Sequence, residues 1–137
     1  MTAMKRRILC CAILFLLLVG ILLYANMPER RIARFVARHG ERLVVSIETS
    51  GSISANIGIR TWNEWAGEHD MWEFILWTRG SRYYGCYYSP DDVPLAFQNT
   101  DVALEDADAV WHWYGEGDNR GSTWRIRSHW YGFQAHF

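Results

Sequence analysis

Hydrophobic and polar positions divide the chain into parts with different patterning. Residues 8–25 form an unbroken apolar run, and no charged side chain occurs between Ile8 and Pro28. Beyond Pro28 apolar positions recur three and four residues apart, and after Gly51 they alternate with polar ones. These periods are typical of an amphipathic helix and of β-strands. The order predicts an apolar helix, an amphipathic helix and a β-rich domain.

The apolar run predicts a transmembrane helix over residues 8–25. Its eighteen residues would rise about 27 Å as a helix, close to the roughly 30 Å hydrocarbon core of a bilayer. A cleaved signal peptide is the rival interpretation, because the basic residues 5–7 precede the run. The run is longer than a signal-peptide core, and the residues before Ala25 make a poor cleavage site. We therefore expect residues 1–27 to be a short tail and an uncleaved anchor, with the lipid bilayer as partner.

Segment 28–50 predicts a juxtamembrane amphipathic helix. Pro28 suits its first turn, where the missing N–H costs nothing. The stretch Leu43–Ile47 also fits a β-strand, so two interpretations stay open for the end of this segment. The face expected to be apolar carries Ile32, Phe35, Val36, His39, Leu43 and Ile47.

Residues 51–137 contain short alternating runs separated by turn residues, as in an antiparallel sheet. They predict a meander of about five to seven strands. With the preceding helices, this sheet places the chain in the α+β class, and we expect the amphipathic helix to pack on the sheet. The runs are Ile57–Trp65, Met71–Thr78, Arg82–Tyr88, Val110–Tyr114, Thr123–Arg127 and Tyr131–Phe137.

The glycine-rich segment Gly115–Gly121 predicts a hairpin turn. A turn centred on Asp118–Asn119 sets Trp113 opposite Trp124. Because side chains alternate between faces, a slip of one residue would place tryptophans opposite arginines. The face expected to be buried consists of Trp111, Trp113, Trp124 and Ile126.

Charge is distributed unevenly although the net charge is only −1. Residues 1–27 carry +3 and residues 28–50 carry +2, whereas residues 51–137 carry −6. Nucleic-acid binding draws most of its affinity from neutralised phosphates, so an acidic domain disfavours it. We expect no nucleic-acid partner.

Flanking charges give conflicting indications of membrane orientation. The count of Lys and Arg on the two sides of the span favours a cytoplasmic domain, whereas a short basic tail before the first helix favours export of the domain. We expect a single-pass protein of the cell membrane with an extracytoplasmic domain.

Side chains suited to catalysis or metal binding are present, but they lack a recognisable spacing. Asp91 and Asp92 are adjacent carboxylates in a proline-flanked turn, and His112 and His136 lie on expected strands. Zinc requires three or four such ligands in a defined geometry. We therefore predict no catalytic, metal or cofactor site, and regard these four residues as a polar cluster that a hydrolase could use. Cys86 is expected to be an inert thiol, and residues 100–109 a solvated acidic loop.

Aromatic residues are more numerous than one small core requires. All eight tryptophans lie between Trp62 and Trp130, and each can bury about 150–250 Å². Exposed aromatic side chains are common at interfaces because they combine a large apolar area with a polar group. The expected binding surface comprises Trp62, Trp65, Tyr87, Tyr88, Tyr114 and Tyr131.

Three strings in the C-terminal half resemble a known group of proteins. They are YYSPDDVPLAFQ (Tyr87–Gln98), GDNRG (Gly117–Gly121) and WYGFQAHF (Trp130–Phe137). They resemble a family of small, uncharacterised, membrane-anchored bacterial proteins, and the resemblance covers roughly the last 55 residues. It implies a bacterial envelope setting and no activity.

Three functions are compatible with these features. The first hypothesis is a membrane-anchored interaction or ligand-binding module that contacts a protein or an envelope polymer. The second is a structural or accessory subunit of a membrane complex, and the third is a hydrolase. No sequence motif selects an enzymatic reaction.

Overall fold

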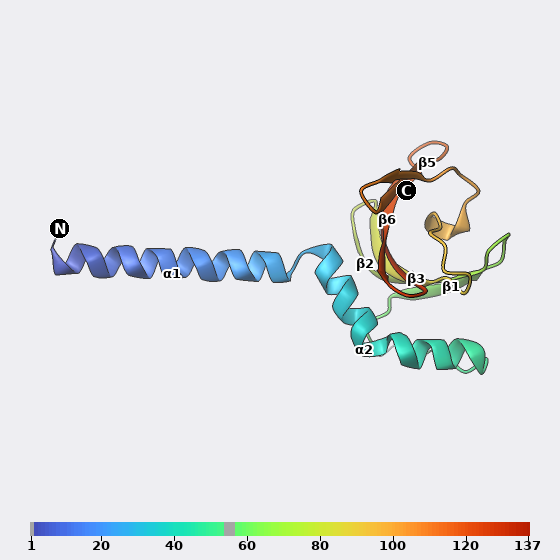
Figure 1. The fold of residues 1–137 in the computed structure, drawn as a ribbon, viewed down its shortest axis with the longest axis horizontal. Helices are drawn as coiled ribbons and strands as arrows, with labels where there is room; N and C mark the ends of the chain where they lie inside the picture. Colours follow the sequence, from blue (N-terminus) through green and yellow to red (C-terminus); the bar gives the residue numbers. More distant parts are fainter. Residues whose placement is uncertain (1, 54–56) are drawn as a thin grey trace. The chain divides into compact units, whose positions relative to one another are not determined.

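The computed structural model describes residues 2–53 and 57–137. The chain divides into two compact units, Met1–Arg31 and Ile32–Phe137. The first contains helix α1, Ala3–Ala25, and the second contains the sheet and most of helix α2, Pro28–Glu48 (Figure 1). The helical interpretation of Leu43–Ile47 is therefore correct, and the strand interpretation is wrong.

Helix α1 is long and apolar enough to cross a membrane, and none of its side chains is buried. It ends where the Asn26 backbone N–H donates to the carbonyl of Leu22 at 3.1 Å and the Asn26 side chain donates to the same carbonyl at 2.9 Å. Pro28 is the first residue of α2. The backbone N–H groups of Arg30 and Arg31, in the first turn of this helix, donate to the carbonyl oxygen of Met27. A proline in the first turn ends one helix and begins the next without losing a hydrogen bond.

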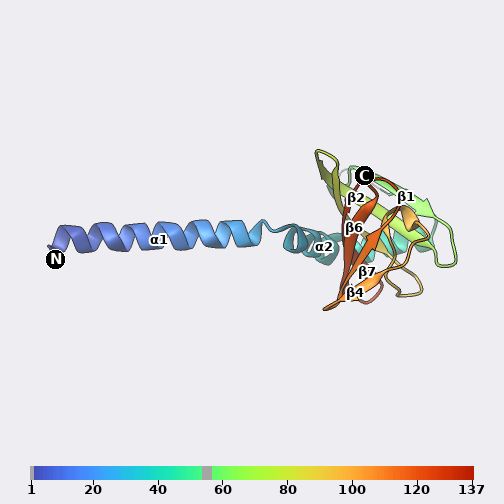
Figure 2. The same cartoon turned by 90° about the horizontal axis from the view of Figure 1, so that it is seen from above.

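The sheet of the second unit is antiparallel, and the described residues supply seven strands in the order β1-β2-β3-β7-β6-β5-β4 (Figure 2). The predicted α+β class and strand number are confirmed. β7 lies between β3 and β6, so the last strand in chain order occupies the middle of the sheet. The strands are β1 (Thr61–Trp65), β2 (Met71–Arg79), β3 (Arg82–Tyr88), β4 (Glu105–Ala107), β5 (Val110–Tyr114), β6 (Arg120–Arg127) and β7 (Trp130–His136).

Two predicted boundaries were wrong. The first strand begins at Thr61 rather than Ile57. The segment expected to be an acidic loop instead forms β4 and a tight turn, with Asp108 and Ala109 at φ 53° and 64°. Two consecutive residues in the left-handed region are typical of the two-residue turns that join antiparallel strands.

Helix α2 covers one face of the sheet. Its buried positions are Ile32, Val36, Gly40 and Leu43, and they belong to a core cluster that includes Phe74, Cys86 and Trp130. Gly40 leaves room for the Arg127 side chain of β6, since a Cβ there would lie 2.5 Å from Arg127 Nη2. The axis of α2 bends near its middle (Figure 1).

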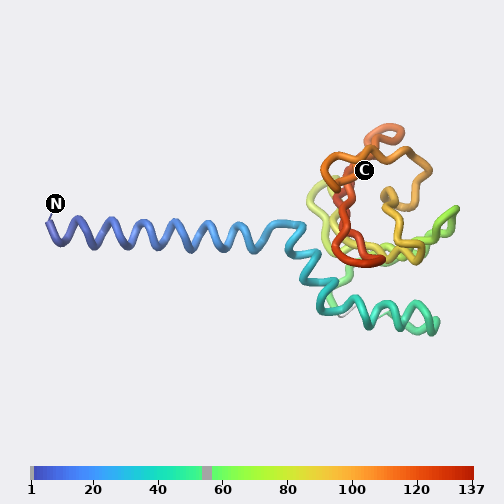
Figure 3. The backbone as a smooth tube through the Cα atoms, in the orientation of Figure 1, coloured from blue at the N-terminus to red at the C-terminus, as the bar shows by residue number. Residues whose placement is uncertain are grey.

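The opposite face is covered by the chain between β3 and β4. This segment, residues 89–104, contains the short 3-10 helix η2, Phe97–Asn99, and runs along the hollow side of the curled sheet (Figure 3). Its residues Leu95, Ala96 and Phe97 pack in a second core cluster. The sheet residues of that cluster are Met71, Ile75, Tyr87, Trp113, Tyr131, Phe133 and Ala135.

The predicted register of the β5–β6 hairpin is wrong. Trp113 pairs with Gly121 rather than Trp124, and Trp111 pairs with Thr123. The turn closes early, where the Gly115 N–H donates to the Asn119 carbonyl at 2.6 Å, so β6 already begins at Arg120. The shift is an odd number of residues, so Trp113 and Trp124 lie on opposite faces and in different core clusters.

Glycines opposite aromatic residues explain this register. A Cβ at Gly121 would lie 2.5 Å from Trp113 Cζ2, and one at Gly132 would lie 2.6 Å from Trp124 Cε2. Each indole therefore lies across its partner strand, where only a glycine leaves room. Two such pairs on successive strands allow bulky side chains on both faces of a strongly curved sheet.

Replacing Gly121 with alanine is expected to destabilise the domain by about 1–3 kcal/mol, because overpacking forces the backbone or a core ring to move. A Cβ at this position would also lie 2.3 Å from the carbonyl oxygen of Gln134. Denaturant unfolding of full-length protein in detergent, followed by tryptophan fluorescence, measures the effect. The neighbouring substitution Ser122→Ala is the control and should change stability little; equal effects of the two substitutions would refute the role of Gly121.

Candidate functional site

The six aromatic residues expected to form a binding surface do not gather in one place. Tyr87 and Tyr131 stack with their ring centroids 5.3 Å apart and are both buried, so the prediction is wrong for these two residues. Tyr88 is half-buried on the α2 side of the sheet. Trp62 on the edge strand β1 is 44% exposed, and Tyr114 on β5 is 68% exposed.

Asp91 and Asp92 are held by different partners. Asp91 contacts His69, with 2.8 Å between Oδ2 and Nδ1. Asp92 accepts hydrogen bonds from the backbone N–H of His129 at 2.9 Å and from the hydroxyl of Tyr131 at 3.1 Å, and it pairs with Arg125. Desolvation would raise the pKa of Asp92, but these hydrogen bonds and the arginine charge outweigh it and lower the pKa. Asp92 thereby ties the 89–104 segment to β7 as an ionised acceptor.

The two histidines of the expected polar cluster lie away from these aspartates. His129, which contacts Asp92, immediately precedes β7, whereas His136 ends that strand. The seven residues of β7 place its two ends about 20 Å apart. His112 lies on β5, opposite Ser122. Among residues 2–53 and 57–137, no group of three metal-ligating side chains comes together.

Cys86 is fully buried, as predicted. Burial raises the pKa of its thiol. A buried, protonated thiol is a poor nucleophile.

A buried carboxyl group, which the sequence analysis did not select, organises the hollow side of the sheet. Glu73 on β2 is 0% exposed. Its Oε1 accepts a hydrogen bond from Trp65 Nε1 at 3.2 Å, and its Oε2 accepts one from the Gln98 backbone N–H at 2.8 Å. Desolvation raises the pKa of Glu73 to about 7, and the two hydrogen bonds oppose the rise. In the sequence, the only indication of this buried carboxyl group was one acidic residue within an otherwise apolar stretch of the strand.

Glu73 and Asn99 fix the backbone of η2 in an unusual conformation. Gln98 and Asn99 have φ values of 56° and 52°, in the left-handed region that non-glycine residues rarely occupy. The Asn99 side chain donates to the carbonyl oxygen of His69 at 2.8 Å, which connects η2 to the β1–β2 loop. Such backbone conformations persist only where the surroundings hold them, and they often mark binding sites.

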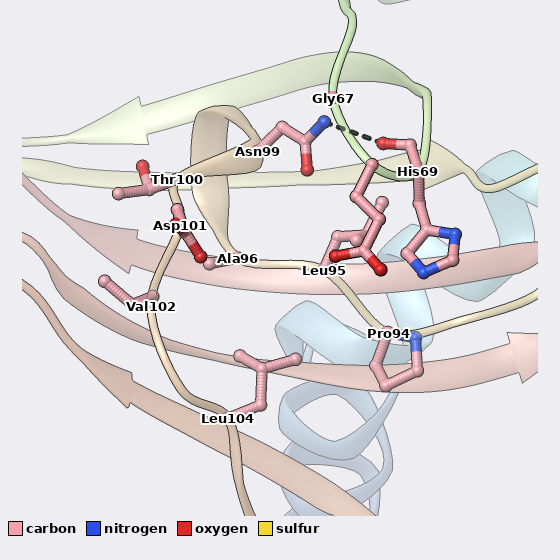
Figure 4. Close-up of a pocket in the computed structure, with 11 residues that line it drawn as sticks. Gly67, His69, Pro94, Leu95, Ala96, Asn99, Thr100, Asp101, Val102 and Leu104 are labelled. Carbon is pink, nitrogen blue, oxygen red and sulfur yellow. Dashed lines mark hydrogen bonds between the residues drawn. The ribbon is translucent and has the colours of Figure 1, made fainter.

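The connection between these loops borders a pocket of about 280 Å³. Residues 67–69 form one wall and residues 94–104 form the other (Figure 4). Glu68, His69, Asn99, Thr100 and Asp101 supply polar groups, and the remaining lining is mainly apolar. Its apolar side chains are Pro94, Leu95, Ala96, Val102 and Leu104.

The lining is chemically suited to a ligand that has a positive charge and a short apolar part. Two carboxylates favour a cation, and the Thr100 hydroxyl adds hydrogen-bonding capacity. The site lies on loops held by a rigid sheet, which is a common position for binding residues.

No protein-family model matches the chain, and neither a curated protein nor a solved structure is similar to it. The resemblance of its C-terminal strings to small membrane-anchored proteins stays a prediction.

Glu73 is expected to make stability fall as the pH rises from about 5 to 8. Its pKa in the folded protein, about 7, lies above the ordinary 4.5, so in this interval the folded protein retains a proton that the unfolded chain has released. The stabilisation is complete below the unfolded pKa and is lost as the pH rises through the folded pKa, by about 3 kcal/mol in total.

Urea unfolding of full-length protein in detergent at several pH values tests this expectation. Glu73→Gln should flatten the pH dependence, whereas Glu64→Gln, which removes an exposed carboxylate from the neighbouring strand, should leave it unchanged. An unchanged slope in Glu73→Gln would show that other groups cause the dependence.

Proposed function

We propose that this chain is a single-pass membrane protein whose domain, Ile32–Phe137, binds an amine-bearing ligand. The observation that carries the proposal is the pocket between residues 67–69 and 94–104, whose walls Glu73 and Asn99 fix through hydrogen bonds to the backbone. Preorganisation of this kind lowers the entropy lost on binding. The ligand is a small amine or an amine-bearing segment of a protein or envelope polymer.

The anchor in this proposal is α1. Its apolar side chains are unburied over the whole helix, which suits contact with lipid rather than with a protein core. At its C-terminal end, Arg30 lies over the Tyr24 ring, 3.6 Å from the centroid. Tyrosine and arginine side chains are typical of the membrane–water interface. We place the domain outside the cytoplasm, because Lys5, Arg6 and Arg7 lie in the first turns of α1, directly before its apolar run.

The ligand class follows from the charge of the pocket. Glu68 and Asp101 are negative at neutral pH, and no Lys or Arg occurs among the lining residues. The Nδ1 atom of His69 contacts the carboxylate of Asp91, which adds a further acidic group beside this loop. An ammonium group beside the carboxylates, with its carbon chain against Val102 and Leu104, satisfies both parts of the lining.

Asp101→Asn should weaken amine binding by up to about fivefold, the magnitude of an exposed ion pair. Calorimetry with full-length protein in detergent would compare cadaverine and glucosamine with their neutral counterparts, pentanol and glucose. Glu116→Gln, an exposed acid in the β5–β6 turn, is the matched control. Equal affinity for amines and neutral compounds, or an equal loss in the control, would refute the ligand class.

Membrane topology is tested with an epitope tag placed after Phe137. Protease added to intact spheroplasts should remove the tag, since the proposal places the domain outside, and lysed cells serve as the control. Protection of the tag until lysis would place the domain in the cytoplasm. Extraction of the protein by an alkaline wash without detergent would contradict the membrane span.

A further inference from the structure

A row of polar side chains, three of them arginines, crosses five strands at one end of the sheet. Cα pairing connects Arg79 on β2 to Arg82 on β3, Arg82 to His136 on β7, and His136 to Arg120 on β6. Arg120 pairs in turn with Tyr114 on β5. Directly paired residues of antiparallel strands point to the same face, about 5 Å apart, so the five side chains share one surface. We call them the cationic row.

The cationic row borders a hollow of about 180 Å³. Next to the row, two residues along the strand, Gln134 adds an amide group, and the Gly121 backbone also contributes. The complete lining is Arg82, Tyr114, Arg120, Gly121, Gln134 and His136.

His136 is held in place at the centre of the row. Its Nε2 lies 2.9 Å from the Ser81 hydroxyl, and its Nδ1 lies 3.3 Å from the carbonyl oxygen of Asp118. These contacts connect the β2–β3 turn to the β5–β6 turn on either side of the hollow. The two contacts of His136 therefore fix the walls of the hollow.

The arginines of the row lack counterions. Among the residues that the structure describes, the side chains of Arg79, Arg82 and Arg120 form no hydrogen bond or ion pair, and all three are exposed. Like charges on directly paired residues destabilise a sheet. The domain carries twelve acidic residues in positions 51–137, yet none pairs with these arginines. Repulsion between these arginines lowers the stability of the domain. An anion bound to the row would neutralise this repulsion.

We propose that the cationic row binds a phosphate group, held between Arg82 and Arg120. The planar guanidinium group donates paired hydrogen bonds to phosphate oxygens. The Tyr114 hydroxyl and the Gln134 amide are the neutral donors on the lining. Arg79 extends the row by one strand and can accept a second phosphate, which favours pyrophosphate over a single phosphate.

The hollow favours a compact anion over a long polymer. One or two phosphate groups fit its size, and the acidic surface of the domain repels the rest of an extended polyanion. The proposal differs from the amine pocket in position and charge, so either site can exist without the other.

Calorimetric titration of full-length protein in detergent, with its C-terminus untagged, tests the row. The probes are inorganic phosphate and pyrophosphate. The double variant Arg82→Gln/Arg120→Gln should bind pyrophosphate at least about tenfold more weakly, the loss expected when hydrogen bonds to a charged group are removed. Arg38→Gln/Arg42→Gln on α2, with the same change of charge, should bind as the wild type does.

Thermal unfolding followed by tryptophan fluorescence shows whether each variant is folded. The Arg82/Arg120 variant should unfold at the same or a higher temperature, since it removes repulsion between paired positive residues. Lower stability together with lost binding would indicate a structural role and overturn the proposal. Failure of wild-type protein to bind pyrophosphate at low salt, or an equal loss in both double variants, would do the same.

Two further titrations identify the source of the phosphate. Binding confined to vesicles that contain phosphatidylglycerol, and absent from phosphatidylcholine vesicles, would assign the group to a lipid headgroup if the Arg82/Arg120 variant loses it. Binding of soluble pyrophosphate assigns it to a free phosphate compound. An affinity for single-stranded oligonucleotides that exceeds pyrophosphate affinity and grows with length would overturn the compact anion in favour of nucleic acid.

Discussion

The pairing of β3 with β7 is the contact on which the rest of the domain depends. It joins residues 82–88 to residues 130–136 and places β7 between β3 and β6. Without it, β1–β2–β3 and β7–β6–β5–β4 would be two separate small sheets. The same pairing confines segment 89–104 to the hollow side, where Glu73 can reach its backbone. Both candidate sites depend on the β3–β7 pairing. The pocket is lined by the confined segment, and the cationic row requires β3, β7 and β6 to lie side by side.

Local sequence patterns were sufficient to predict the elements but not their arrangement. The spacing of apolar positions and the turn residues predicted the bounds of α2, β2, β3 and β5 closely. Both signals depend only on residues that are neighbours in the sequence. The β5–β6 register was predicted wrongly because the alternation of apolar and polar residues fits two arrangements. In one, Trp113 and Trp124 share a face; in the other, they lie on opposite faces, each packed over a glycine. The decisive residues were Gly121 and Gly132, which appear in a sequence as turn or weak strand positions.

The candidate sites show the same division. The Glu73 signal, one acid in an apolar strand, was present in the sequence, yet its partner Gln98 lies on a distant segment with unusual backbone geometry. The cationic row could not be predicted, because Arg79, Arg82, Arg120 and His136 become neighbours only through strand order. Tyr87 and Tyr131 were misassigned because a curled sheet with both faces covered buries more aromatic surface than a flat meander with one solvated face.

The central position of the last strand has a consequence for biosynthesis. A chain that emerges in order from its N-terminus produces β3 well before β7, so β3 has an unpaired edge while translation or translocation continues. Exposed strand edges readily pair with other chains. The short interval before residues 130–136 emerge is therefore when this domain depends most on chaperones, and neighbouring nascent copies that exchanged this strand would form swapped assemblies.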